Sequence, residues 1–281
     1  MTLARWPKLC SLALGSFGYQ SDFSLGPADE VSFSHFLDSH PSLKYIRLQW
    51  NFKRWMSPVE VQLDLSPDAL PELDTFVGIY QQLNRLPNRD TIETLDLTCE
   101  PLHESRVDII CPILQSMTSL TSLDLWTHVL NPNEDNTRFF TTILSACPKL
   151  TDFHFMCTMT FTAKPLKQLL SQLYLLPQLK RFSLTKGHKY GDESMLGSAL
   201  QILQATPTLQ QINIRWAREN APNHLKQEGT YDVTCGDDGL PTYIMVHEQG
   251  IPFFGRPFDR QYKHIVRWPM RQRNTSMMLS R

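Results

Sequence analysis

The sequence lacks the motifs from which most nucleotide and catalytic sites are built. Its 281 residues include only 12 glycines, and neither the G-x-G-x-x-G fingerprint nor a P-loop occurs. No G-x-S-x-G motif is present, and Gly15-Ser16-Phe17-Gly18 is the nearest approach to that nucleophile elbow. Catalytic groups can still converge from distant positions, but these absences make an enzyme the least favoured class. We predict a non-enzymatic protein without a cofactor.

Metal, disulfide and membrane signals are missing as well. The six cysteines form no C-x-x-C pair, and we expect them to be reduced in a cytoplasmic or nuclear protein. His35 and His40 are five residues apart on an expected helix, which places them on different faces, so we predict no metal pair. No apolar run approaches the roughly 20 residues of a membrane helix, so we predict no membrane association.

Positive charge is scarce except at the C-terminal end. Residues 252–281 hold seven Lys or Arg and one acid, whereas the preceding 251 residues hold 20 bases and 27 acids. We interpret residues 251–281 as a basic, flexible tail and expect no nucleic-acid partner. A salt-dependent contact with RNA or DNA through this tail is kept as an alternative function. The side chains that would make that contact are Arg256, Arg260, Lys263, Arg267, Arg271 and Arg273.

What the sequence does contain is one phrase repeated along most of its length. The phrase reads Pro, any residue, Leu, two residues, apolar, any residue, apolar, as in PKLTDFHF from Pro148. Six copies begin with proline and two do not, and most are about 30 residues apart. A period of this length indicates a repeat protein. The leading apolar residues of the eight copies are Leu9, Leu43, Leu73, Ile92, Leu120, Leu150, Leu179 and Leu209.

Each repeat combines a strand pattern with a helix pattern. The end of the phrase alternates apolar and polar residues, as in Leu123-Asp124-Leu125, which predicts a strand with one buried face. Between phrases the apolar spacing becomes helical. Pro165 and Asp192 are predicted to lie at helix starts. The helical sets are Val107, Ile110, Leu114 and Met117; Phe140, Ile143, Leu144 and Cys147; Leu166, Leu169, Leu170 and Leu173; and Leu196, Leu200 and Leu203.

A barrel and an open solenoid both satisfy this order of strands and helices. Barrel strands are covered on both faces and read as continuous apolar runs. Here the second face carries polar residues such as Asp96, Asp124 and Asn213, so the open solenoid is favoured. We therefore predict an α/β, right-handed leucine-rich-repeat solenoid over residues 1–218, of the ribonuclease-inhibitor-like kind. Its parallel sheet is expected to curve, with the helices on the convex side.

Two segments depart from the repeat. Val59 to Leu65 alternates like an additional strand ahead of the third repeat. Tyr231–Thr234 and Thr242–Val246 flank Gly236-Asp237-Asp238-Gly239, which predicts a β-hairpin. We expect residues 219–250 to form this hairpin and to cap the open edge of the last repeat.

The outward side chains of the strands define the candidate site. Successive parallel strands place them in columns about 4.8 Å apart on the concave face. We hypothesise an acidic patch with an aromatic anchor, Trp126, because exposed Trp and Met beside acids are typical of protein contacts. The alternative is that these are ordinary solvated residues. The predicted partner-binding residues are Arg47, Asp96, Asp124, Trp126, Asp152, His154, Met156 and Arg181.

Three stretches of the sequence resemble a known family. LPELDTFVGIYQQLNRLPNRDTIETLDL, YDVTCGDDGLPTYIMVHEQG and HPSLKYIRL are similar to the leucine-rich-repeat region of fungal, basidiomycete-type F-box proteins. The resemblance covers residues 5 to 250, and the F-box itself does not occur in this sequence. It implies recognition of a substrate protein for a cullin-type ubiquitin ligase. An adaptor subunit of the ligase would be a partner only through an F-box upstream.

The function predicted from the sequence is therefore protein binding on the concave sheet face. The partner protein is not identified by the sequence. A free-standing repeat scaffold unrelated to ubiquitin is the alternative within the same class.

Overall fold

The computed structural model describes residues 6–15, 27–49, 63–127, 134–157, 161–187, 194–217, 227–249 and 261–267. The chain divides into two compact units, each treated separately below. Unit 1 comprises residues 1–126 and 145–150, and unit 2 comprises residues 127–144 and 151–281. The domain boundaries expected at residues 218 and 250 stay predictions.

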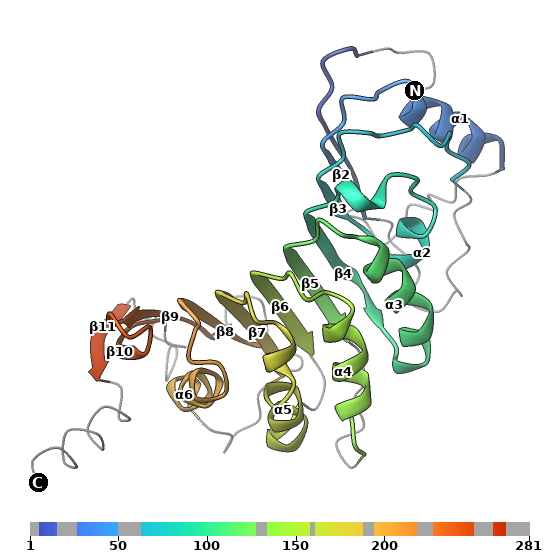
Figure 1. Ribbon diagram of the computed structural model, residues 1–281. Coiled ribbons are helices and arrows are strands. Elements are labelled where there is room, and N and C mark those ends of the chain that lie inside the picture. The colour runs from blue at the N-terminus through green and yellow to red at the C-terminus, as the bar shows by residue number, and fades with distance from the viewer. Residues whose placement is uncertain are drawn as a thin grey trace, which may run out of the picture. The chain divides into compact units, whose positions relative to one another are not determined.

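Unit 1 is a parallel sheet whose strands follow chain order. The strands are β1 (Ser11–Gly15), β2 (Tyr45–Gln49), β3 (Thr75–Val77), β4 (Thr94–Leu102) and β5 (Ser122–Thr127), the last residue of which belongs to unit 2. The helical segments α2 and α3 lie together on one face of this sheet (Figure 1). The helical segments of this unit are α1 (Pro27–Asp38), α2 (Tyr80–Leu83), η1 (Arg89–Thr91), η2 (Glu104–Arg106) and α3 (Val107–Ser116).

Unit 2 begins with parallel strands and ends with antiparallel ones. The parallel strands are β6 (Asp152–Cys157), β7 (Arg181–Gly187) and β8 (Gln211–Ala217). The antiparallel strands are β9 (Gln227–Cys235), β10 (Pro241–Gln249) and β11 (Gln261–Arg267). Helices α5 and α6 lie on the same face of the sheet (Figure 1). The helical segments are α4 (Thr137–Ser145), α5 (Ala163–Leu170), η3 (Leu173–Leu175) and α6 (Met195–Ala205).

The repeat phrase forms a turn followed by a strand in seven copies, and in the copy from Asp90 the helical segment η1 takes the place of the turn. The amide of the leading residue closes the turn, as where Leu150 N donates to Cys147 O across 3.2 Å. From Leu43 onward every leading residue is at most 2% exposed. The proline lies just before it, where it cannot extend the preceding helix. The predicted strands are therefore confirmed in place and in kind.

The helices bury the predicted apolar stripes with one correction. Val107, Ile110 and Leu114 are buried on α3 as expected. On α6 Leu203 is buried as predicted, but the prediction is wrong for Leu196 and Leu200, which are half-buried. The helix buries Met195, Ala199 and Ile202 instead. The helix is rotated because both sets satisfy helical spacing, and packing on the sheet selects between them.

The sequence predicted which residues lie at the starts of α5 and α6. Pro165 lies in the first turn of α5, as predicted. The N-cap of α6 is Ser194, whose Oγ accepts a hydrogen bond from Gly197 N across 3.0 Å. Asp192, the predicted cap, lies outside the described residues. Serine in this position satisfies one of the free amides at the helix start.

The hairpin predicted after the repeats is confirmed by β9 and β10, which pair antiparallel. Tyr231 on β9 is fully buried, and its hydroxyl donates to Glu248 Oε1 on β10 across 2.6 Å. Its ring covers Gly229, where an added Cβ would lie 2.7 Å from the Tyr231 hydroxyl. Tyr231 thus closes the core of unit 2 beyond the last repeat.

The structure corrects two predictions, one for residues 261–267 and one for residues 63–65. Residues 261–267 form β11 against β10, so this part of the expected flexible tail is a strand of the sheet. Residues 261–267 form a strand because Tyr262, Ile265 and Val266 favour extended backbone. The extra strand expected over residues 59–65 does not form at residues 63–65, and its remainder lies outside the described residues.

A strand followed by a helical connection, repeated along a parallel sheet, is the leucine-rich-repeat arrangement. The predicted α/β class and leucine-rich-repeat fold are confirmed by the strand order, the parallel register and the one-sided helices. The right-handed winding and the curvature of the sheet stay predictions.

Candidate functional site

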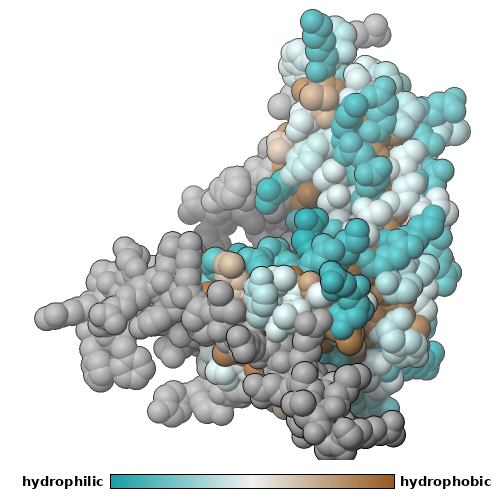
Figure 2. Space-filling model, turned by 60° about the vertical axis from the view of Figure 1, so that its left-hand side comes forward, coloured by the Kyte–Doolittle hydropathy of each residue, from teal (hydrophilic) through white to brown (hydrophobic). Residues whose placement is uncertain are grey.

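The face of each sheet opposite the helices is the candidate site, and we call it the open face. Burial alternates along the strands, so that β6 buries Phe153, Phe155 and Cys157 and turns the intervening residues outward. Figure 2 shows hydrophilic and hydrophobic residues interspersed over the described surface on the side in view. In unit 2 the described residues of the open face include Asp152, His154, Met156, Arg181, Ser183, Thr185, Gln211, Asn213, Arg215, Glu228, Thr230, Asp232, Tyr243, Met245 and His247.

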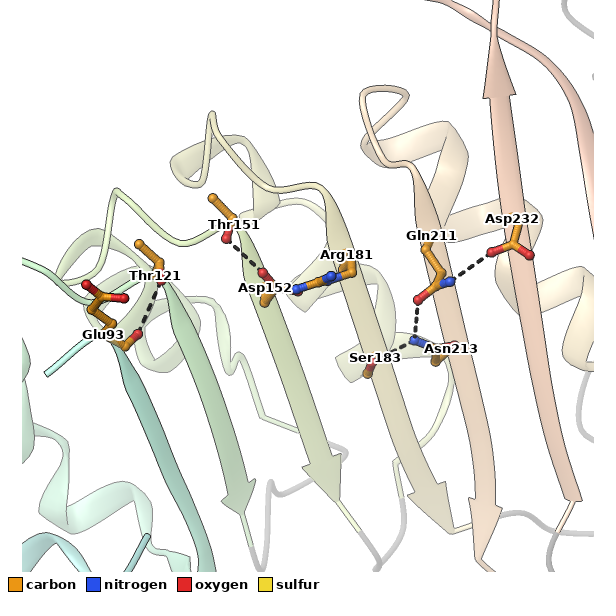
Figure 3. Close-up of polar contacts among 9 residues, drawn as sticks. All are labelled: Glu93, Thr121, Thr151, Asp152, Arg181, Ser183, Gln211, Asn213 and Asp232. Atoms are coloured by element: carbon orange, nitrogen blue, oxygen red, sulfur yellow. Dashed lines mark hydrogen bonds and ion pairs between the residues drawn. The ribbon is translucent and has the colours of Figure 1, made fainter. Parts of the chain in front are cut away.

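The first two strands of unit 2 are joined on this face by an ion pair. Arg181 Nε donates to Asp152 Oδ1 from the neighbouring strand, and Thr151 Oγ1 donates to Asp152 Oδ2 across 2.7 Å (Figure 3). The hydrogen bond and the charge of Asp152 raise the pKa of Arg181. Asp152 is therefore compensated by Arg181 on this face, and the acidic patch predicted around Asp152 stays a hypothesis.

A second polar cluster joins β7, β8 and β9. Gln211 Nε2 donates to Asp232 Oδ1 across 2.8 Å, and Gln211 Oε1 accepts from Asn213 Nδ2 across 3.3 Å. Asn213 Nδ2 is also 3.3 Å from Ser183 Oγ (Figure 3). The side chains point toward one another across the strands, so this part of the open face is ordered before any partner arrives.

The remaining open-face charges of unit 2 form pairs as well. Arg215 Nε lies 2.7 Å from Glu228 Oε1, and His247 Nε2 lies 3.5 Å from Asp232 Oδ2. His154 Nε2 is within hydrogen-bond distance, 2.9 Å, of Thr185 Oγ1. Among the described side chains of this face on β6 to β10 there are two arginines and three carboxylates, so their charge is mixed rather than strongly acidic.

The open face of unit 1 carries the other predicted residues. Arg47 and Asp96 lie in one row with Val77 between them, and Val77 is buried. The Asp96 carboxylate accepts hydrogen bonds from Thr98 N and Thr98 Oγ1 across 2.8 and 2.6 Å. Asp124 is half-buried on β5.

Two donors on the open face of unit 1 have no hydrogen-bond partner. They are Arg47 Nε and Trp126 Nε1, both buried from solvent although each residue is half-exposed. Buried donors are nearly always paired in folded proteins, and each unpaired one calls for an explanation. An acceptor supplied by a bound molecule is one such explanation.

The eight predicted site residues are thus divided between the units. Arg47, Asp96, Asp124 and Trp126 belong to unit 1, and the structure brings Asp152 and Arg181 together in unit 2. His154 and Met156 lie on β6 in unit 2. A patch that joins Asp124 and Trp126 to Asp152 spans the two units and stays a hypothesis.

The sequence did not single out the open-face residues of the hairpin. Asp232, Met245 and His247 come from β9 and β10, which were predicted only as a cap. The alternation of Tyr231-Asp232-Val233-Thr234 was the signal that could have found Asp232, since Tyr231 is buried and Asp232 therefore points to the other face.

Glu100 on β4 is a carboxylate in an unusual environment. Burial raises the pKa of Glu100, against opposing effects from a hydrogen bond with Gln81 and the charges of His103 and Arg106. Glu100 Oε2 and Gln81 Oε1 are buried without further partners.

In the part of the chain that the structure describes, no three His, Cys, Asp or Glu residues come together as a possible metal site. No described helix is long and apolar enough to span a bilayer.

Comparison with known proteins shows a similarity of fold to solved structures. No family model matches the chain, and no curated protein matches it. Among solved structures it is similar to the leucine-rich-repeat-containing protein LegL7 from Legionella pneumophila, at 19% identity and a TM-score of 0.37. The match covers 68% of this chain and 52% of LegL7, so the chain spans about half the length of that structure. The leucine-rich-repeat fold therefore rests on the strands and helices described above.

Proposed function

We propose that this chain is a protein-interaction module that binds its partner on the open face of the sheet. The observation that carries the proposal is the ordered row of polar side chains across β6 to β10, above all the cluster of Ser183, Gln211, Asn213 and Asp232. Leucine-rich-repeat modules generally serve as scaffolds for protein interaction. Side chains held in place before binding lose less conformational entropy when a partner arrives.

The open face of unit 1 supports the same function. Arg47 Nε and Trp126 Nε1 are buried donors that lack acceptors. Trp and Arg are the residue types most enriched among the side chains that dominate binding energy at protein interfaces.

The test compares two matched substitutions. Asn213→Arg places a long charged side chain in the middle of the open face of unit 2, and Gln201→Arg makes the same kind of change on the exposed side of α6. Each tagged full-length chain is used to capture proteins from its own cells, and the bound proteins are identified by mass spectrometry. We expect partners that are lost with Asn213→Arg and retained with Gln201→Arg. If every captured protein is indifferent to Asn213→Arg and to a matched change at Trp126, the open face is not the binding site.

The finer proposal is that the partner is a substrate of a cullin-type ubiquitin ligase. Its support is the resemblance of residues 5 to 250 to the repeat region of fungal F-box proteins. An open-face-dependent partner should then carry more ubiquitin when the natural protein is overproduced, and should persist longer after a block of protein synthesis when the protein is deleted. An unchanged half-life would leave the alternative, a repeat scaffold unrelated to ubiquitin.

A further inference from the structure

We infer that the end of the open face formed by β8, β9 and β10 binds a protein segment carrying an apolar side chain beside a Lys or Arg. The apolar side chain would lie on Met245 and the cation on Asp232. This inference rests on the proposed function and adds the chemistry of the partner.

Met245 is the apolar anchor of this surface. Its side chain is 39% exposed on β10, between Tyr243 and His247 on the same face. The other large apolar side chains exposed in the described ranges lie elsewhere: Trp6 before β1, Ile109 on α3, Tyr174 on η3 and Leu240 in the hairpin turn. Met adapts its shape to varied partners because it is unbranched and polarizable.

Asp232 is the carboxylate of this face that the described arginines leave unpaired. Asp152 and Glu228 on the same face each pair with an arginine, Arg181 and Arg215. Asp232 instead has Gln211 as its donor and His247 at 3.5 Å, and its side chain is 46% exposed. No described Lys or Arg side chain forms an ion pair with it. A Lys or Arg of a partner would give Asp232 the ion pair that Asp152 and Glu228 already have.

The geometry allows one segment to reach both residues. Met245 and Asp232 are directly opposite each other across β9 and β10. Opposite residues in an antiparallel pair have Cβ atoms about 4.5–5.5 Å apart. Side chains at positions i and i+2 of an extended segment lie about 7 Å apart on one face, which is close enough to span the pair.

The charge of the surface argues against two other occupants. An acidic segment beside Met245 would face Asp232, and like charges at this range are unfavourable. Nucleic-acid phosphates would meet the same carboxylate, whereas Glu228 is already paired with Arg215. Both occupants are outcomes that the following selection can reveal.

The experiment selects binders from a random 12-residue peptide library displayed on phage, with the full-length chain as bait. The strongest peptides are synthesised and titrated by fluorescence anisotropy. The inference expects enrichment of Leu, Met or an aromatic residue within two positions of Lys or Arg. Met245→Ser and Asp232→Asn should each weaken binding by about tenfold or more. Asp232→Asn keeps the oxygen that Gln211 uses, so the fold is preserved.

Two control variants match these changes in the hairpin turn. Leu240→Ser removes an apolar side chain that is 49% exposed, and Asp237→Asn removes an exposed carboxylate, both away from the open face. Both should leave the affinity within about twofold, since exposed positions outside an interface contribute little. Raising the salt from 50 to 500 mM should weaken binding to the natural protein and have little effect on Asp232→Asn, because screening acts on the ion pair.

Charge reversal gives the sharpest readout. A selected peptide whose Lys or Arg is replaced by Glu should bind Asp232→Lys better than it binds the natural protein. Selected peptides that are acidic, or whose binding depends on Trp126 and not on Met245 and Asp232, overturn this inference and leave the proposed function standing. If no selected peptide loses binding when an open-face residue is substituted, the result counts against this inference and against the proposed function.

Discussion

The side-chain amide of Gln211 donates to Asp232 Oδ1 across 2.8 Å, and this bond joins the last parallel strand to the first antiparallel one (Figure 3). The open face therefore continues from the repeats into the hairpin without a break in its polar contacts. The hairpin closes the core with Tyr231 on one side and extends the candidate binding surface with Asp232 on the other.

Tyr231 should contribute to stability mainly through its ring. Tyr231→Phe removes the hydrogen bond to Glu248 and should lower the free energy of unfolding by about 1–2 kcal/mol. Tyr231→Ala also removes a fully buried aromatic side chain and should cost about 3–5 kcal/mol. Urea unfolding followed by circular dichroism measures both. Equal losses for the two variants would mean that the ring contributes nothing beyond its hydroxyl.

Core positions at the edge of unit 1 should matter less than those in the middle. Leu12 and Leu95 lie in one row of the sheet, linked through Ile46 and Phe76. Leu95 is fully buried, whereas Leu12 on the edge strand β1 is half-buried. Leu95→Ala should cost about 2–5 kcal/mol and Leu12→Ala less than half as much. Urea unfolding measures both variants, and equal costs would show that β1 is covered as completely as β4.

Glu100 should make stability depend on pH. Its pKa is raised in the folded protein, so the unfolded chain loses the proton first as pH rises. Its favourable contribution is present below the ordinary value of 4.5 and is lost as pH rises through the folded value. Glu100→Gln should therefore raise the melting temperature at pH 7, and this gain should shrink toward pH 4.5.

The control for Glu100 is Glu104→Gln, which removes a carboxylate from an exposed position of η2. It should change the melting temperature at pH 7 by less than Glu100→Gln does. A lower melting temperature for Glu100→Gln at pH 7 would show that the charges of His103 and Arg106 outweigh the cost of burial.

The cysteines should differ sharply in reactivity. Burial raises the pKa of Cys111 to about 11 and that of Cys147 to about 12, so neither forms much thiolate at pH 8. Cys10 and Cys235 are exposed and should react with Ellman's reagent within minutes. Mass spectrometry after brief labelling should find adducts on these two, and on Cys111 and Cys147 only after unfolding. Equal labelling of all four in the native protein would contradict the burial of α3 and of the turn before Leu150.

Most of the fold could be predicted from the sequence because its signals are local. The alternation of Leu123-Asp124-Leu125 and the proline turn before each strand act within a few residues. The rotation of α6 could not be predicted, since Leu196 and Leu200 fit helical spacing as well as Met195 and Ala199 do. Only packing against the sheet decides between them.

The candidate site was predicted less completely, because it depends on register between strands. Asp152 and Arg181 occupy the same place in successive repeats, so the period places them side by side, but their ion pair was not predicted. Asp232 lies opposite Gln211 because of the antiparallel register of β8 and β9. The sequence of either strand alone does not determine that register. For the same reason Met245 could not be placed beside Asp232.

Photo-crosslinking tests the central claim, binding on the open face, most directly. Benzoylphenylalanine replaces Asn213 on the open face in one variant and Gln201 on the exposed side of α6 in the other. Each full-length variant is irradiated in its own cells, and the adducts are identified by mass spectrometry. The account predicts protein adducts from position 213 and none of the same proteins from position 201. Adducts from position 201 alone would contradict it.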